Sequence, residues 1–309
     1  MAVKREGRVS AVKLIEGDVL DVLSGLPRSS KYNLILSSPP YNIGKDYERD
    51  TRRSLDQYVE WLDQVISALV SRLSPNGSIC WQVGNYVKDG ESFPLDIYLY
   101  DSFKSRGLQL RNRIVWRFNF GLHSSKRFSG RYETLMWFTK SNDYKFNLDP
   151  IRIPQLYPGK RHSARKGGLP SGNRLGKNPS DYWEFSAEEH FLNAPVWDIP
   201  NVKANHPEKT IHPCQFPVEL AERCVLALTG EGDAVLDPFL GVGTTAVAAL
   251  KHKRLITGID KDPEYLRIAR TRIKALERGA LKIRPSGKPV ASPRATDKVA
   301  RVPEEWLNT

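Results

Sequence analysis

Short runs of aliphatic, β-branched and aromatic residues alternate along the chain with longer segments in which apolar residues recur every three or four positions. The short runs predict strands, since turn residues bound them and they are too short for helices. Helical periodicity extends from Leu55 to Leu73, after the capping box Ser54-Leu-Asp-Gln57. Two more helices are expected, from Pro217 to Leu228 and from Asp262 to about Glu277. The expected strands are 12–15, 33–37, 78–83, 113–118, 134–139, 234–237 and 255–259.

This alternation predicts the α/β fold class, with a doubly wound, mostly parallel sheet. With 309 residues, the chain is long enough for one large domain of this kind plus a smaller insert. Residues 149–205 break the pattern, because they carry much proline and glycine and show no periodicity. Irregular segments of that length inside compact domains are usually functional binding loops. We therefore expect an insert there that ends near His206.

Several features point to a cytoplasmic protein. No run approaches the roughly 20 apolar residues that span a bilayer, so no membrane association is expected. The first seven residues lack the hydrophobic segment of a secretory signal. The three cysteines show no metal-ligand spacing, so no metal site is expected. We expect reduced thiols, with Cys80 and Cys224 as small core residues.

The formal net charge of +12 is concentrated in blocks. Residues 102–132 contain eight Lys/Arg and no acid, and residues 150–180 contain seven Lys/Arg and no acid. Aromatic side chains are interleaved with both blocks, which is typical of a surface that faces a polyanion such as a nucleic acid. Solvated basic faces are the alternative, because charge alone is a weak signal. Residues 278–301 are also basic and, being rich in Pro, Ser and Ala, predict a flexible tail.

The first candidate site follows the expected strand at 33–37. Pro39 and Pro40 end that strand, since neither can donate a ladder hydrogen bond. The loop Ser38-Pro39-Pro40-Tyr41 is thus stiff, with a hydroxyl at one end and a flat aromatic ring at the other. A planar heterocycle with an exocyclic amine needs such a hydrogen-bond acceptor and such a ring to stack on.

The second candidate site is the run Asp237-Pro238-Phe239-Leu240-Gly241-Val242-Gly243, which lies between a strand and a helix that begins near Thr244. Glycines let the backbone approach a ligand closely, and the helix N-terminus offers free N–H groups to a carboxylate or phosphate. Asp260 ends the next strand, where an acid is placed to accept hydrogen bonds from ribose hydroxyls.

Two cofactors fit this loop. The spacing Gly241-x-Gly243-x-x-Ala246 matches the loose dinucleotide fingerprint, so on the loop alone NAD and S-adenosylmethionine are equally supported. However, no complete second half of a dinucleotide fold follows it. Phe239 beside the ligand suits a sulfonium through cation–π attraction. The loop at 38–41 has no role in hydride transfer, so the methyl donor is favoured.

In this order the motifs resemble the permuted, β-type members of the amino-methylating DNA methyltransferases, in which the catalytic Ser/Asp-Pro-Pro-Tyr precedes the target-recognition region and Phe-x-Gly-x-Gly follows it. The resemblance extends to about Arg272. Many relatives have Thr-Gln-Lys-Pro after His-Pro, whereas this chain has Cys214-Gln215-Phe216-Pro217. Further matches are Glu16-Gly17-Asp18-Val19-Leu20, Arg131-Tyr132-Glu133 and His212-Pro213.

The resemblance implies a Rossmann-like methyltransferase fold with a circularly permuted motif order. It assigns residues 1–148 to the catalytic half of the domain and 149–205 to an irregular target-recognition insert. Residues 206–278 become the half that binds S-adenosylmethionine, and 279–309 a basic flexible tail.

It also implies residue roles. Ser38 and the carbonyl of Pro39 accept the two N–H groups of the target amine, next to Pro40, and Tyr41 stacks on the extruded base. The cofactor contacts would come from Asp237, Phe239, Gly241 and Gly243 around the donor, Asp260 at its ribose, Asp18 at its adenine, and His212 and Thr244 at its methionine end. For Asp18 the alternative is a surface turn, and for His212 a structural role.

For the target base, the resemblance favours cytosine N4 over adenine N6, because Ser at the first motif position occurs more often with cytosine. Acceptor chemistry does not force the choice, since a serine hydroxyl can accept from either amine. Remoter alternatives are an RNA or protein-amide methyltransferase and a non-catalytic DNA-binding protein. The expected partners are double-stranded DNA and a cognate restriction endonuclease, with the chain a monomer or a homodimer.

Contacts with the DNA would come from polar and basic residues around the site and in the insert. Asn42 would lie near the target base, or else in a turn with Gly44, and Trp81 and Trp116 are expected in the core. The candidate DNA contacts are Lys45, Arg127, Arg152, Arg165, Asn173, Arg174 and Lys177.

Overall fold

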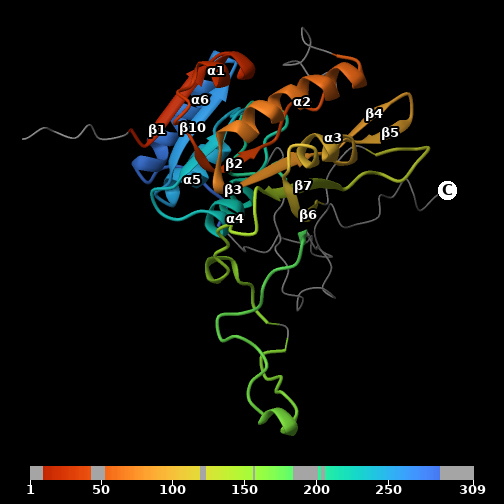
Figure 1. Ribbon diagram of the computed structural model, residues 1–309, viewed down its shortest axis with the longest axis vertical. Coiled ribbons are helices and arrows are strands. Elements are labelled where there is room, and N and C mark those ends of the chain that lie inside the picture. Colours follow the sequence, from red (N-terminus) through yellow and green to blue (C-terminus); the bar gives the residue numbers. More distant parts are fainter. Residues whose placement is uncertain are drawn as a thin grey trace, which may run out of the picture.

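The computed structural model describes residues 10–42, 53–118, 123–155, 157–183, 201–202 and 206–285. Their centre is an eight-stranded sheet in the order β1-β10-β9-β2-β3-β7-β6-β8 (Figure 1). The strands are β1 (Val12–Glu16), β2 (Tyr32–Ser37), β3 (Leu73–Val83), β6 (Gln109–Arg117), β7 (Tyr132–Thr139), β8 (Tyr182–Trp183), β9 (Ala234–Asp237) and β10 (Leu255–Asp260).

Only β7 runs against its neighbours in this sheet. It pairs antiparallel with β3 and with β6. The pairs β1–β10, β10–β9, β9–β2, β2–β3 and β6–β8 are parallel. The expected doubly wound, mostly parallel sheet is therefore confirmed.

Helices cover both faces of the sheet. Because strand side chains alternate between faces, Leu34 and Leu36 of β2 pack on one side and Ile35 on the other. The face of Ile35 carries α1 (Val19–Gly25), α2 (Leu55–Arg72) and α3 (Leu95–Lys104). The opposite face carries α4 (Val218–Leu228), α5 (Thr244–Lys251) and α6 (Pro263–Glu277). None of the helices in the described residues is long and apolar enough to cross a membrane.

The elements mostly match the sequence pattern. The four expected helices, α2, α4, α5 and α6, are present, and the capping box at Ser54 forms as predicted. Cys80, Cys224, Trp81 and Trp116 are buried, as expected. The pattern missed α1, α3 and the small hairpin of β4 (Asn85–Lys88) and β5 (Glu91–Pro94).

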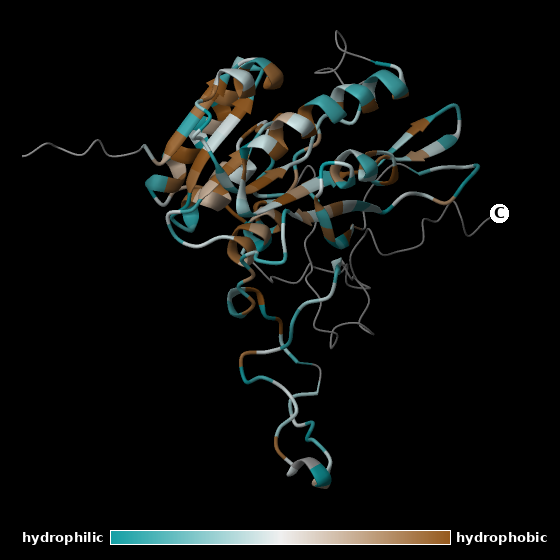
Figure 2. Cartoon of the chain, in the orientation of Figure 1, coloured by the Kyte–Doolittle hydropathy of each residue, from teal (hydrophilic) through white to brown (hydrophobic). Residues whose placement is uncertain are grey.

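The insert is not structureless. Within 149–183 the chain runs out and back as a narrow arm, with bridges from Ile153 to Lys177 and from Arg161 to Pro170, and a short 3-10 turn at Ala164–Lys166 between them. The arm projects from the body in Figure 1, and it is largely polar whereas the strands are apolar (Figure 2). Strand β8 then returns to the sheet beside β6.

Candidate active site

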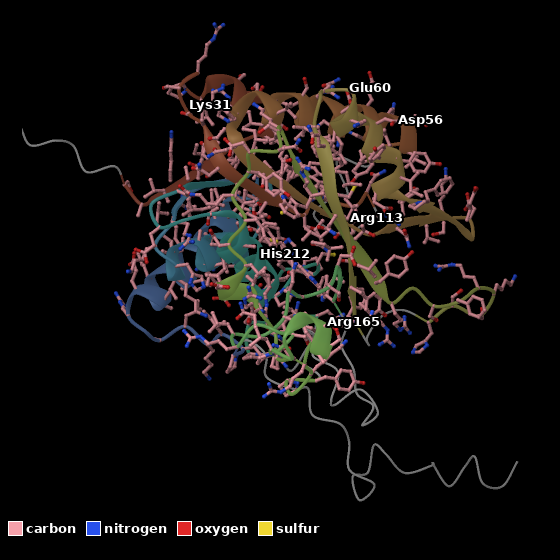
Figure 3. All side chains as sticks on the ribbon, turned by 60° about the horizontal axis from the view of Figure 1, so that its bottom comes forward. Lys31, Asp56, Glu60, Arg113, Arg165 and His212 are labelled. Atoms are coloured by element: carbon pink, nitrogen blue, oxygen red, sulfur yellow. The ribbon has the colours of Figure 1, made fainter. Side chains whose placement is uncertain are left out.

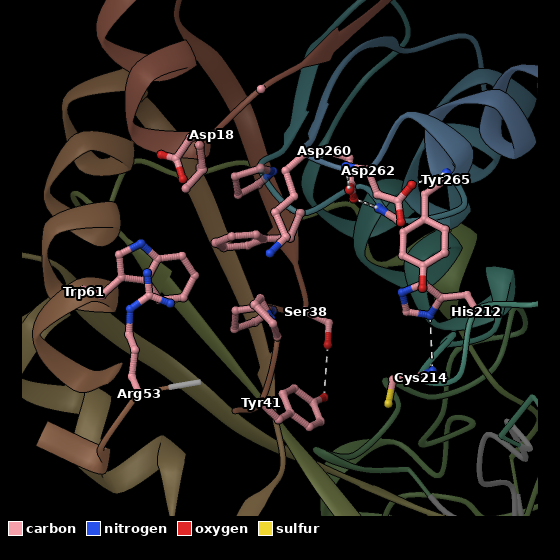
Figure 4. Close-up of a pocket in the computed structure, with 18 residues that line it drawn as sticks. Asp18, Ser38, Tyr41, Arg53, Trp61, His212, Cys214, Asp260, Asp262 and Tyr265 are labelled. Carbon is pink, nitrogen blue, oxygen red and sulfur yellow. Dashed lines mark hydrogen bonds between the residues drawn. The ribbon is translucent and has the colours of Figure 1, made fainter. Parts of the chain in front are cut away.

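The main pocket of the described residues lies at the carboxyl ends of β2, β9 and β10, where ligands bind in open α/β sheets. It contains about 1010 Å³ of space, counting the part open to solvent. The loop after β2 contributes Ser38, Pro39, Pro40 and Tyr41, as predicted. The predicted cofactor residues Asp18, His212, Phe239, Gly241 and Asp260 also line it (Figure 4).

A chain of hydrogen bonds fixes the loop after β2. Ser38 Oγ donates to Tyr41 Oη at 3.0 Å, and Tyr41 Oη donates to Glu133 Oε2 at 3.3 Å. Gln82 Nε2 donates to the same Glu133 oxygen. Burial, and next the charge of Glu133, raise the pKa of Tyr41 well above its usual value, so this phenol stays protonated.

The backbone of this loop is held from α2. Tyr58 Oη donates to the carbonyl of Pro40 at 2.7 Å. One edge of the Tyr41 ring lies against Gly84, where an added Cβ would sit 3.3 Å from Tyr41 Cε2. The ring therefore rests on backbone at that edge while the residue also lines the pocket.

Three of the predicted cofactor residues are not among those that line the pocket. Asp237 is buried and accepts hydrogen bonds from Ser37 Oγ at 2.6 Å and from the Phe239 N–H at 3.1 Å, so it joins β2 to β9 and shapes the turn. Its burial raises the pKa of the Asp237 carboxyl to about 6. Thr244 is also buried, in the first turn of α5.

Gly243, the third of these predicted cofactor residues, allows α5 and α6 to pack closely. Its φ is +81°, and an added Cβ would lie 2.8 Å from the Cβ of Ala269 on α6. Gly241, at φ +52°, lies on the pocket wall, where an added Cβ would be 3.3 Å from His212 Nε2. The two glycines thus differ, one allowing close helix packing and the other close approach at the pocket.

Asp260 organises the pocket floor. Its Oδ2 accepts from the Gly241 N–H at 2.6 Å, and its Oδ1 accepts from the Asp262 N–H at 2.9 Å. Burial raises the pKa of the Asp260 carboxyl, while these two backbone donors lower it. The carboxylate therefore fixes two loops and still borders the pocket.

His212 packs on Tyr265, with ring centroids 4.7 Å apart. Its Nδ1 accepts from the Cys214 N–H at 3.2 Å, which leaves the proton of the neutral ring on Nε2. Burial lowers the pKa of His212 to about 4, so the ring is neutral at pH 7.

An aromatic wall that the sequence reasoning missed closes the opposite side. Trp61 of α2 lies edge-on to Phe239 at 5.6 Å, and the Arg53 guanidinium stacks on Trp61 at 4.5 Å. Asn42 binds the backbone of Arg53 twice, accepting from its N–H at 3.0 Å and donating to its carbonyl at 2.7 Å. The helical spacing of Trp61 in α2 gave no sign of this role.

The predicted DNA contacts fall into three groups. Lys45 lies outside the described residues. Arg152 is engaged within the arm, at 2.7 Å from Asp149 and bonded to the Gly176 carbonyl, so its guanidinium braces the arm. Asn173 accepts from the Leu175 N–H as a turn residue. The remaining candidates, which are exposed, are Arg127, Arg165, Arg174 and Lys177, with Arg165 on the arm in Figure 3.

Comparison with known proteins bears on the identity of the chain. A family model described as DNA methylase matches residues 32–271. The Type II methyltransferase M.BglII of Bacillus subtilis is 46% identical over 83% of this chain and 67% of that protein. The DNA adenine methyltransferase YhdJ of Escherichia coli is 30% identical over 85% of this chain and 83% of that protein.

A solved structure has the same fold. The DNA modification methylase TTHA0409 of Thermus thermophilus, determined with S-adenosyl-L-methionine and described as putative in function, superposes with a TM-score of 0.56 and 25% identity, covering 85% of this chain and 93% of that one. The family model spans most of the chain, and the matched range includes the loop after β2 and the turn of Phe239 and Gly241, which line the pocket. The protein therefore belongs to the DNA methylases that act on exocyclic amines, and it is a DNA amino-methyltransferase dependent on S-adenosylmethionine.

Proposed function

We propose that the enzyme transfers a methyl group to the N4 amine of a cytosine extruded from duplex DNA. The observation that carries this proposal is Ser38, whose hydroxyl lines the pocket and donates its own proton to Tyr41. Its oxygen lone pairs are thereby left to accept an amine N–H.

The pocket fits the methyl donor, which supplies an electrophilic methyl group on a sulfonium. Phe239 and Trp61 offer aromatic surface to the adenine and the sulfonium. Asp260 is proposed to accept from the ribose hydroxyls. His212 presents its Nε2–H, next to Gly241, to the carboxylate of the donor. Asp18, an exposed residue that lines the pocket and whose Oδ1 caps α1 by accepting from the Leu20 N–H at 2.8 Å, is proposed to accept from the adenine amine through its other oxygen.

The target amine is a poor nucleophile, because its lone pair is delocalised into the ring. Ser38 Oγ and the Pro39 carbonyl accept its two N–H groups and draw the nitrogen toward tetrahedral geometry, so that the lone pair points at the methyl group. The ring of Tyr41 stacks on the base. Positioning and these aimed acceptors supply most of the rate gain.

The same hydrogen bonds offer a path for the proton that the methylated nitrogen must lose. A proton passed to Ser38 Oγ releases the Ser38 hydroxyl proton to Tyr41 Oη, and that of Tyr41 to Glu133 Oε2. One proton thus leaves the nitrogen and one arrives on the carboxylate. Because Tyr41 keeps a high pKa, it relays this proton without remaining ionised.

Cytosine is proposed over adenine on the identity of Ser38, since Ser at this motif position occurs more often with cytosine in the enzymes that the chain resembles. The similarity to YhdJ keeps adenine N6 as the second candidate. The similarity to Type II methyltransferases such as M.BglII favours a cognate restriction endonuclease, whose cleavage the methylation would block.

The test is nucleoside mass spectrometry on DNA from cells that express the protein. We expect N4-methylcytosine from the wild type and its loss with Ser38→Ala, because losing one preorganised hydrogen-bonding group costs about 10²–10³ in kcat. The exposed Ser71→Ala is the matched control. N6-methyladenine would refute the proposed base, and methylation that persists undiminished in Ser38→Ala would refute the proposed role of Ser38.

A further inference from the structure

One apolar side chain stands out on the basic surface. Phe128 is 99% exposed, more than any other large hydrophobic side chain in the described residues. It lies in the loop between β6 and β7, which we call the 123–131 loop, and which extends from the body in Figure 1. Keeping an aromatic ring in water costs free energy, but single exposed rings are ordinary on protein surfaces, so the meaning of this ring depends on its position and its neighbours.

The register of the sheet places this loop at the edge that holds the active site. β7 begins at Tyr132, and its Thr134 pairs with Val83, the last residue of β3. β3 is parallel to β2, whose last residue precedes Ser38. The 123–131 loop and the catalytic loop thus leave the same edge of the sheet.

The chain distance is also short. Glu133 contacts Tyr41, and only five residue steps separate Glu133 from Phe128. Even fully extended, those steps span at most about 18 Å between the two Cα atoms. A ring at Phe128 is therefore within reach of a duplex whose target base occupies the pocket.

The surroundings of Phe128 suit nucleic acid rather than an apolar partner. Lys126, Arg127 and Arg131 flank it, and residues 123–131 include no acid. The loop is also internally braced, since Ser129 Oγ accepts from the Ser124 N–H at 3.1 Å. Cations that contact phosphates together with one projecting aromatic ring are the means by which proteins insert a wedge into a base stack.

We propose that Phe128 is an intercalating wedge that enters the DNA helix beside the target and occupies the space that the extruded base leaves. Stacking on the neighbouring bases offsets the cost of extrusion. This inference rests on the proposed action on duplex DNA and adds a positioning residue for it. Phe128 does not touch the reacting atoms.

The experiment compares kcat/KM on two duplexes that carry the mapped recognition site, one fully paired and one with an abasic position opposite the target base. Extrusion is cheaper from the second duplex. We expect Phe128→Ala to lower kcat/KM about 10- to 100-fold on the paired duplex and little on the abasic one. This range corresponds to the free energy of stacking one base on an aromatic ring. Phe128→Trp should retain activity on both. Lys126→Ala, the control for loss of charge, should lower kcat/KM by the same factor on both duplexes.

Several outcomes would overturn the wedge. One is a kcat/KM of Phe128→Ala equal to that of the wild type. Another is an equal loss of kcat/KM on both duplexes, which would show that Phe128 is a general DNA contact. A wild-type chain that methylates neither duplex would refute the proposed function itself, and the wedge with it. Wild-type activity with an unaffected Phe128→Ala would refute the wedge alone.

Discussion

At the scale of single residues, the sequence identified the residue types of the site better than their roles. Asp237 was expected to contact the cofactor, but its carboxylate is buried and joins two strands. Asn42 was expected near the base or in a turn. Its φ is 57°, and its side chain makes two bonds to the Arg53 backbone, so it joins the catalytic loop to the residues that precede α2. Gly44, its expected partner in the turn, lies outside the described residues.

The burial of Asp237 predicts a pH dependence of stability. Its pKa is raised to about 6, above the value of about 3.9 in an unfolded chain. Between these pH values the folded protein holds a proton that the unfolded chain has lost. The contribution of this group to the free energy of unfolding therefore falls by up to about 3 kcal/mol as pH rises from about 4 to 6, and above that pH it is constant.

The measurement is urea unfolding at pH 4 and pH 7, of the wild type and of Asp237→Asn. The amide oxygen can still accept from Ser37 and Phe239 but does not titrate, so the variant should lack this part of the pH dependence. Acids remote from Asp237 titrate in both proteins and cancel in the comparison, whereas Asp260 interacts with the Asp237 charge and adds to the difference in the same comparison. An identical pH dependence in the two proteins would contradict the raised pKa.

At the scale of elements, the strands and long helices were readable because each carries its own periodicity and caps. The hairpin β4–β5 and helix α3 were missed. The hairpin is a separate two-stranded sheet whose strands pair with each other and contact α3, and strands of four residues carry too little periodicity to be recognised. The helical periodicity ends at Leu73 and the next strand was expected only from residue 78. Instead β3 begins at Leu73, and the irregularity in its pairing with β2 absorbs the residues in between.

Gly243 allows a prediction at this scale. Replacing it with Ala should destabilise the protein by about 2–5 kcal/mol, because a left-handed φ costs about 1–2 kcal/mol and overpacking against Ala269 about 1–3. Gly279→Ala is the matched control, since Gly279 has φ +68° with no atom within 4 Å of an added Cβ. Equal losses of unfolding free energy in the two variants would show that packing of α5 on α6 has no part in the effect.

At the scale of the whole molecule, the arm and the pocket proposed for S-adenosylmethionine can be altered independently. The arm closes on itself through the bridge between Ile153 and Lys177, while the pocket lies at the carboxyl edge of the sheet. Replacing residues 157–174 with a short Gly-Ser link should therefore keep S-adenosylmethionine binding and thermal stability but abolish site-specific methylation. Calorimetric titration with the donor and methylation assays on duplex DNA measure the two parts.

A milder variant tests the charge of the arm. Arg165→Ala with Arg174→Ala should lower the slope of log affinity against log salt by about 2, if each arginine contacts one phosphate. An unchanged slope would show that these exposed side chains do not contact phosphates. Loss of donor binding in the shortened arm would show instead that the arm supports the pocket.

The sequence by itself determined the element order, the two loops of the site and the basic surface, because strand runs, proline stops, glycine turns and caps act between near neighbours. Only the tertiary structure decided which groups meet. Tyr41 and Glu133 are 92 residues apart, and Ser37 and Asp237 are 200 apart. Such contacts depend on strand order and register, which no local pattern encodes. For the same reason, only the fold shows that Trp61 lines the pocket and that Asp237, Gly243 and Thr244 do not.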